Sequence, residues 1–135
     1  MLENCLFDYA VIRVVPRVER EEFINVGVIL SCPSRKFLEA QIQLDKQRLK
    51  AFAPTVEPET IQNYLDAIPR ICAGDEEAGE IGRLPQRARF YWLTAQRSTI
   101  IQCSPVHTGF CTDAREMLVH LFDKVVRTTE NCFKV

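Results

Sequence analysis

The segment 97–111, RSTIIQCSPVHTGFC, brings together several side chains that could do chemistry. Arg97 carries a permanent positive charge, and His107 offers an imidazole, a side chain that can act as a general acid or base. Gly109 permits a backbone turn that exposes N–H groups, and a helix N-terminus is expected shortly afterwards. We interpret this segment as a loop between a strand and a helix that binds an anionic small molecule. The predicted ligand-binding residues here are Arg97, Ser98, Ser104, His107 and Thr108.

The same segment allows a zinc interpretation. Cys103, His107 and Cys111 have the spacing C-x3-H-x3-C, and Cys72 or His120 could supply a fourth ligand. Structural zinc sites favour two close pairs of ligands, which this spacing does not provide. We therefore predict no metal and no cofactor.

A third interpretation is nucleophilic catalysis. His107 could activate Ser104, Cys111 or Cys72, and His107 and Ser104 are the candidate catalytic residues. The segment lacks the GxSxG pattern of a nucleophile elbow, and no third, orienting group can be assigned. The fourth alternative is a polar turn whose hydroxyls only satisfy backbone groups.

Two polar residues interrupt strongly apolar stretches: Arg13 in AVIRVV and Asn25 in FINVGVIL. If the connecting hairpin is centred near Glu19, Arg13 lies opposite Asn25 and shares a face with it. Gly27 is expected on that face as well, leaving space beside them. A buried guanidinium needs a partner, such as a nearby glutamate or a ligand anion. Arg13 and Asn25 are therefore further predicted ligand-binding residues; the alternative is a solvated face with a β-bulge.

Patterning predicts the elements that position these residues. β-Branched and aromatic residues, or strict alternation, indicate strands over 6–15, 23–30, 36–44 and 98–103. Helices are expected over 46–53, from Pro58 to a break or kink at Pro69, over 86–93, and after Asp113. The acidic, glycine-containing stretch 73–85 is expected to form a surface loop.

These elements predict an α+β fold in a single domain over residues 1–135. A small, mainly antiparallel sheet of three to four strands is expected to be covered on one face by several helices. The amphipathic C-terminal helix is the clearest of these helices, and His120 lies off its apolar stripe.

Bulk composition excludes some functions. The 17 Lys and Arg nearly balance the 18 Asp and Glu, so we do not expect nucleic-acid binding; a local patch of Arg83, Arg87, Arg89 and Arg97 would be its only basis. No run is long and apolar enough to cross a membrane, and the first residues do not form a secretory signal. We expect a cytoplasmic protein whose six cysteines are reduced thiols.

Three stretches, YAVIRVVPRVEREEFINVGVIL, IPRICAG and RSTIIQCSPVHTG, together resemble the bacterial family catalogued as domain of unknown function 3037. The resemblance runs over nearly the whole chain and carries no established activity, cofactor or catalytic residue. Members are often encoded beside a HipA-like kinase, which implies a partner or a shared pathway. In relatives we expect proline at the position of Cys103, which argues further against zinc.

Two functions follow from these observations. The preferred one is a cytoplasmic binding or regulatory module that works with a partner protein, for which the resemblance suggests a HipA-like kinase. The alternative is a small enzyme acting on a phosphorylated or nucleotide-like substrate. In that alternative Arg13 and Arg97 hold the charge and His107 is the general acid or base.

Overall fold

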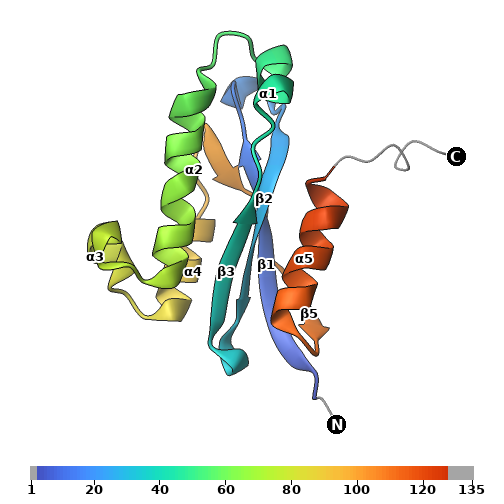
Figure 1. Ribbon diagram of the computed structural model, residues 1–135, viewed down its shortest axis with the longest axis vertical. Helices are drawn as coiled ribbons and strands as arrows, with labels where there is room; N and C mark the ends of the chain where they lie inside the picture. The colour runs from blue at the N-terminus through green and yellow to red at the C-terminus, as the bar shows by residue number, and fades with distance from the viewer. Residues whose placement is uncertain (1–2, 128–135) are drawn as a thin grey trace, which may run out of the picture.

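The computed structural model describes residues 3–127 and contains a five-stranded antiparallel sheet (Figure 1). Its order is β3–β2–β1–β4, and β5 also pairs with β1. The strands are β1 (Cys5–Val14), β2 (Ile24–Cys32), β3 (Phe37–Ile42), β4 (Ile101–Cys103) and β5 (His107–Cys111). The expected meander of the first three strands is confirmed.

Two of the helices, α1 and α5, begin at an aspartate whose side chain caps the first turn. Asp45 accepts a hydrogen bond from the Arg48 N–H, and Asp113 accepts one from the Glu116 N–H, as is typical of N-cap aspartates. Gly74, with φ 73°, ends the longest helix in the left-handed conformation that suits glycine. The helices are α1 (Lys46–Phe52), α2 (Pro58–Ala73), α3 (Gly79–Gly82), α4 (Gln86–Thr94) and α5 (Ala114–Val125).

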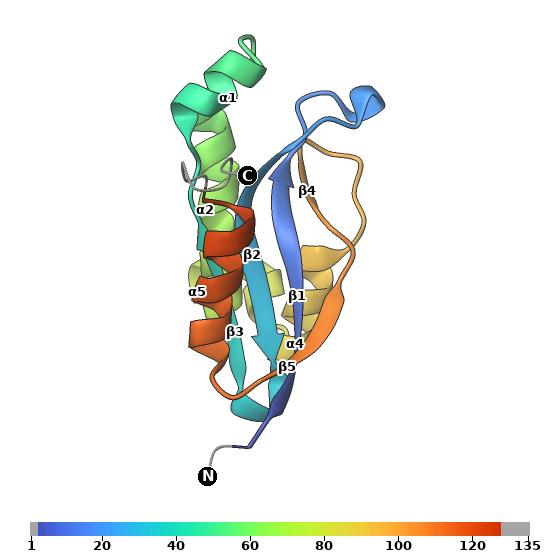
Figure 2. The same ribbon diagram turned by 90° about the vertical axis from the view of Figure 1, so that its right-hand side faces the viewer.

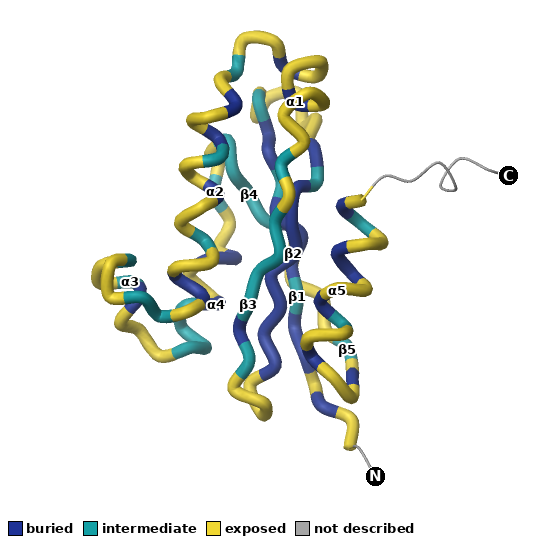
Figure 3. Tube along the Cα trace, viewed as in Figure 1, coloured by how far each residue is buried: buried dark blue, intermediate teal, exposed yellow. Residues whose placement is uncertain are grey.

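Helices cover both faces of the sheet, whereas the sequence analysis placed them on one. Figures 1 and 2 show α2 and α4 on one side and α5 alone on the other. Successive residues of β1 therefore enter two separate apolar clusters: Ile12 and Val14 pack with α2 and α4, and Phe7 packs with α5. This explains why β1 and β2 are near-continuous apolar runs, with most residues buried (Figure 3).

The predicted hairpin register is confirmed, since Arg13 pairs with Asn25. The expectation for Gly27 is wrong. A bulge between these pairs makes Gly27 the partner of Ile12, which places it on the α2 face, opposite to Arg13 and Asn25. A Cβ at Gly27 would lie 2.8 Å from the Gln41 carbonyl oxygen, so glycine allows β3 to approach closely.

Three local expectations need correction. Helix α2 does not end at Pro69 but continues to Ala73, and the stretch 73–85 contains the short helices Glu76–Ala78 and α3. Residues 107–111 form strand β5 rather than part of a loop.

Over residues 3–127, none of the helices combines the length and apolar character needed to cross a bilayer.

Candidate functional site

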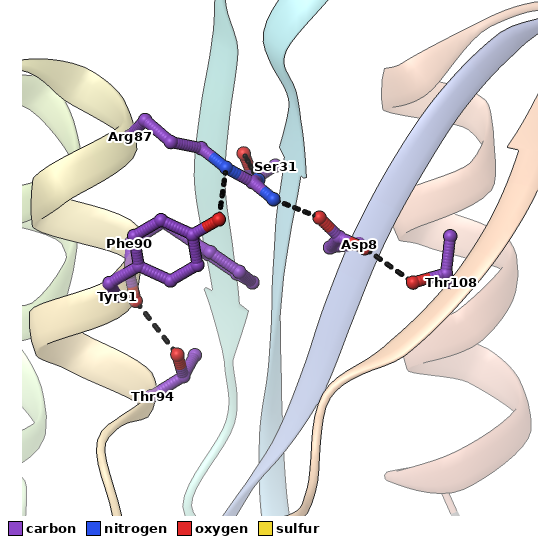
Figure 4. Close-up of polar contacts among 7 residues, drawn as sticks. All are labelled: Asp8, Ser31, Arg87, Phe90, Tyr91, Thr94 and Thr108. Carbon is purple, nitrogen blue, oxygen red and sulfur yellow. Dashed lines mark hydrogen bonds and ion pairs between the residues drawn. The ribbon is translucent and has the colours of Figure 1, made fainter.

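A polar network connects α4 to three strands on the face that α2 and α4 cover (Figure 4). Its centre is Asp8 of β1, which is buried. Arg87 of α4 forms an ion pair with one carboxylate oxygen of Asp8, and the Thr108 hydroxyl of β5 donates to the other at 2.6 Å. Arg87 also donates to the Ser31 hydroxyl of β2 at 2.9 Å and to the Tyr91 hydroxyl at 3.2 Å.

Local structure explains why these side chains meet. Asp8 and Thr108 are direct cross-strand partners, so they share a face of the sheet. Arg87 lies in the first turn of α4, and Tyr91 follows one helical turn later on the same side of the helix. The long arginine side chain spans the distance from the helix to the sheet.

The network fixes the charge state of its members. Burial raises the pKa of Asp8, but the hydrogen bonds from Thr108 and Arg87 and the charge of Arg87 outweigh it and hold that pKa below its usual value. Burial lowers the pKa of Arg87, but the hydrogen bonds to Asp8 and Tyr91 and the charge of Asp8 outweigh it. The pKa of Arg87 therefore lies above its usual value. Asp8 is therefore a paired carboxylate at neutral pH. It holds α4 and β5 against β1 and does not act as a free general base.

Beside this network the sheet leaves apolar side chains uncovered. Leu6 and Phe110 are cross-strand partners on β1 and β5, and they are 51% and 69% exposed. We call Leu6 and Phe110 the apolar patch. A group of large exposed apolar residues at one place is typical of an interaction surface.

The patch adjoins a free edge of the sheet. In the described chain, β4 and β5 both pair with β1 and with no other strand (Figure 2). Val11 and Val15 direct their backbone groups toward this side, because the Val11 C=O accepts from Ser104 N–H and Val15 N–H donates to Ile100. Backbone directions alternate along strands, so Thr108 and Phe110 of β5 direct their N–H and C=O groups outward.

The edge segment carries no protecting charge. Residues 98–112 contain no Asp, Glu, Lys or Arg, although these types make up 26% of the chain. Free edge strands in proteins are commonly protected by charged side chains, proline or bulges. Here Pro105 only separates β4 from β5, and the outward-facing positions of β5 are unprotected.

Ser104, a predicted catalytic and ligand-binding residue, is part of the sheet itself. It is 1% exposed, its hydroxyl accepts the Val11 N–H at 2.8 Å and donates to the Pro105 carbonyl at 2.9 Å. The hydroxyl replaces a backbone acceptor where the chain leaves β4. It is therefore fully engaged in structure.

His107 and Thr108 point to opposite faces of the sheet. The His107 ring packs on Tyr9 at 5.2 Å between centroids, whereas Thr108 belongs to the Asp8 network. Gly109 is a strand residue rather than a turn residue. A Cβ there would lie 3.0 Å from the ring of Phe7, so glycine lets the aromatic ring of its cross-strand partner pack over it.

Arg13 and Asn25 lie together but apart from the other predicted residues. The Arg13 guanidinium stacks over Phe23 at 4.1 Å, and no ion pair among residues 3–127 involves it. Asn25 donates to the carbonyl of Val125 at the end of α5. Arg13 Nε and Asn25 Oδ1 are buried and make no hydrogen bond within the described chain.

Arg97 lies in the loop that follows α4, three residues after the last residue of that helix. Its Nη1 donates to the Leu93 carbonyl at 3.2 Å, its Nη2 donates to that of Trp92, and the guanidinium stacks over the Trp92 ring at 4.4 Å. Ser98 follows it in an exposed loop. The seven predicted ligand-binding residues thus occupy several places: the structure joins Arg13 with Asn25 and Thr108 with Asp8, and brings no larger set together.

Within residues 3–127, the side chains that the zinc and thiolate alternatives require do not lie together. Cys103 faces α4, while Cys111 packs with α5 and lies about 13 Å along β5 from His107. Within residues 3–127, no three His, Cys, Asp or Glu side chains form a group that could hold a metal ion. Burial raises the pKa of Cys72 to about 12 and that of Cys103 to about 11, and it also raises the pKa of Cys111. These thiols are neutral near pH 7 and weak nucleophiles.

At the candidate site, sequence reasoning missed Asp8, Ser31 and Tyr91, and it placed Arg87 in a basic patch. Asp8 gave the same signal as Arg13, because it is a charged residue inside an apolar, β-rich run. Arg87 is instead neutralised by Asp8, and Arg89 donates to the carbonyls of Ile71 and Cys72. Both arginines therefore make structural contacts within the protein and do not contribute to a basic surface patch.

The fold and site define a class: a small α+β protein with helices on both faces of an antiparallel sheet and one uncharged free edge. The chain belongs to the family described as protein of unknown function (DUF3037), whose model matches residues 9–126. No curated protein and no solved structure matches the chain.

Proposed function

We propose that this protein is a bacterial, cytoplasmic binding module that holds a partner protein at the outer edge of β4 and β5. The observation that carries this proposal is an edge without charged residues, next to the exposed Leu6 and Phe110. Strand addition to such an edge gains main-chain hydrogen bonds, and side-chain contacts beside it provide specificity.

The chemistry of the partner segment follows from this edge. The segment is extended, so that its backbone pairs with the outward N–H and C=O groups of Thr108 and Phe110. It is uncharged, because a charge placed against the apolar patch would lose hydration without finding an opposite charge. At least one large apolar side chain covers Phe110.

Binding has better support than the alternative, an enzyme acting on a phosphorylated or nucleotide-like substrate. The Ser104 hydroxyl is engaged at both ends, and His107 contacts the Tyr9 ring rather than an acid or a nucleophile. Arg13 and Arg97 lie at separate places, so they do not form one anion clamp. A catalytic site needs such groups to converge on one reacting atom.

One further observation supports a cytoplasmic setting, and the family resemblance suggests a partner. The five cysteines in the described part of the chain are free thiols, which suits a reducing compartment. The gene neighbourhood of the family makes a HipA-like kinase the first partner to test.

The test is co-expression of this protein with a HipA-like kinase of the same bacterium, followed by size-exclusion chromatography and hydrogen exchange. We expect a complex in which the amide hydrogens of Thr108 and Phe110 exchange more slowly than in the free protein. The variant Phe110→Lys adds a charge to the outer edge and is expected to weaken the complex at least about ten-fold.

Val119→Lys is the matched control, because Val119 is an exposed valine on α5 and lies away from the edge. It is expected to leave the complex unchanged. A complex that Phe110→Lys does not weaken, or the absence of any complex, contradicts the proposal. A homodimer that protects the same amides would assign the edge to a second copy of this chain instead.

A further inference from the structure

A cavity of about 400 Å³ lies between α2, α4 and β4, separate from the apolar patch. Its walls are mainly aliphatic and come from Ile68 and Ile71 of α2, Leu93 of α4, and Ile101 of β4. Cavities of this size with mostly apolar walls and a few polar groups are typical of small-molecule sites.

Two aromatic side chains flank the cavity and remain exposed. Tyr64 of α2 is 54% exposed and Trp92 of α4 is 40% exposed. Much of the surface of both rings is in contact with water, and a ligand that covers it gains free energy by burying that apolar surface. The cavity therefore offers an apolar ligand both a floor and two covering rings.

Among residues 3–127, Arg97 is the only charged residue that lines this cavity. Its guanidinium is held in place by the Trp92 ring and by two carbonyls of α4. These two bonds leave three of its five N–H donors, including Nε–H, without a partner within residues 3–127. No carboxylate from the described part of the chain lines the cavity, and none of its acidic residues forms an ion pair with Arg97.

The other polar groups of the wall are engaged within the protein. The Thr99 hydroxyl donates to the Ile101 carbonyl, and the Gln102 side-chain amide donates to the Thr99 carbonyl. The Cys103 thiol donates to the Leu93 carbonyl. Arg97 alone is left to recognise the polar end of a ligand, and it is pre-oriented to do so.

We propose that this cavity binds a small carboxylate with an apolar body, whose carboxylate contacts Arg97 and whose body lies between Tyr64 and Trp92. A preoriented guanidinium beside an apolar cavity favours an anionic head over a neutral or cationic one. This site shares β4 with the proposed docking edge, but its test uses the protein alone and does not depend on a protein partner.

The chain contains a single tryptophan, Trp92, so its fluorescence reports directly on this cavity. The experiment titrates the intact protein with octanoate, octanol and octylammonium, all below their aggregation concentrations. These probes share one apolar body and differ in the charge of the head. We expect saturable binding of octanoate with a shift of Trp92 emission, at least about ten-fold tighter than octanol, and no saturable binding of octylammonium.

Variants locate the contact. Arg97→Gln is expected to reduce octanoate affinity to that of octanol, whereas Arg83→Gln, which removes the same charge outside the cavity, leaves it unchanged. Ala67→Phe fills the cavity and is expected to abolish binding of both probes, with the far-ultraviolet circular dichroism spectrum unchanged. Equal affinity of wild-type protein for octanoate and octanol would overturn the anionic head, and no saturable binding of either probe would overturn the site.

Discussion

Asp8 and Arg13 are both charged residues within β1, and their environments differ completely. Asp8 has a hydroxyl donor on β5 and a guanidinium from α4. Arg13 has an aromatic ring beneath it and no ion pair in the described chain. The first residue contributes to holding the fold, because its charge is balanced and its hydrogen bonds are made. The second leaves a buried Nε–H unsatisfied.

Asp8→Asn tests the first environment. The substitution removes the negative charge that Arg87 faces, and is expected to lower the free energy of unfolding by about 1–2 kcal/mol at pH 7. This expected loss of stability is smaller than for a fully buried ion pair, because Arg87 remains partly exposed to solvent. Urea denaturation of both proteins measures it, with Asp66→Asn on the exposed side of α2 as the control.

The pH dependence of that difference has a defined sign. The pKa of Asp8 lies below its usual 3.8 in the folded protein, so its contribution is present above pH 3.8 and is lost as pH falls through the folded pKa. The difference in stability between wild type and Asp8→Asn should therefore stay constant from pH 7 to pH 5 and shrink below pH 3.8. A difference that grows on acidification contradicts the ionised, paired state.

At the scale of elements, β4 and β5 act as one edge strand that is interrupted in the middle. Ile12 to Val14 pair with β4, and Cys5 to Tyr9 pair with β5. Between these pairings the Ser104 hydroxyl accepts the Val11 N–H, so the interruption leaves no orphaned amide at Val11. Pro105 can follow directly in the chain, because the Ser104 hydroxyl already supplies the acceptor for the Val11 N–H.

Ser104→Ala removes that acceptor and leaves a buried N–H unsatisfied. We expect the free energy of unfolding to fall by about 1–3 kcal/mol, and the Val11 amide to lose protection from hydrogen exchange. Ser98→Ala, in the exposed loop before β4, should leave both quantities unchanged. Unchanged stability in Ser104→Ala would mean that the sheet does not depend on this hydroxyl.

At the scale of the whole molecule, one sheet separates two apolar clusters. Phe90 of α4 is buried in one cluster, and Phe122 of α5 is buried in the other. Because β1 and β2 contribute alternate side chains to both clusters, loss of either cluster exposes the same strands. The two halves of the molecule should therefore unfold together.

Phe122→Ala tests this coupling. The truncation is expected to lower the free energy of unfolding by about 3–5 kcal/mol. Trp92 lies on the other side of the sheet, so its fluorescence should report the same shifted midpoint as circular dichroism. Two separate midpoints would show instead that the α5 side unfolds independently.

The local elements followed from the sequence because their signals are local. Asp45 and Asp113 cap helices through side chains that reach only a few residues along the chain. The pairing of Arg13 with Asn25 followed from the position of one hairpin. The α+β class and the C-terminal helix needed no more than apolar periodicity.

Only the tertiary structure decided which residues meet at the candidate site. Asp8 and Arg87 are far apart in the chain, and nothing local indicates that the Arg87 side chain of α4 reaches Asp8 of β1. The stretch 107–111 became a strand because β1 offered a free edge, while its own composition of polar residues and glycine suggested a turn. Sequence alone thus determined elements stabilised by near neighbours, and the fold determined the site, because pairing across a sheet depends on partners from distant parts of the chain.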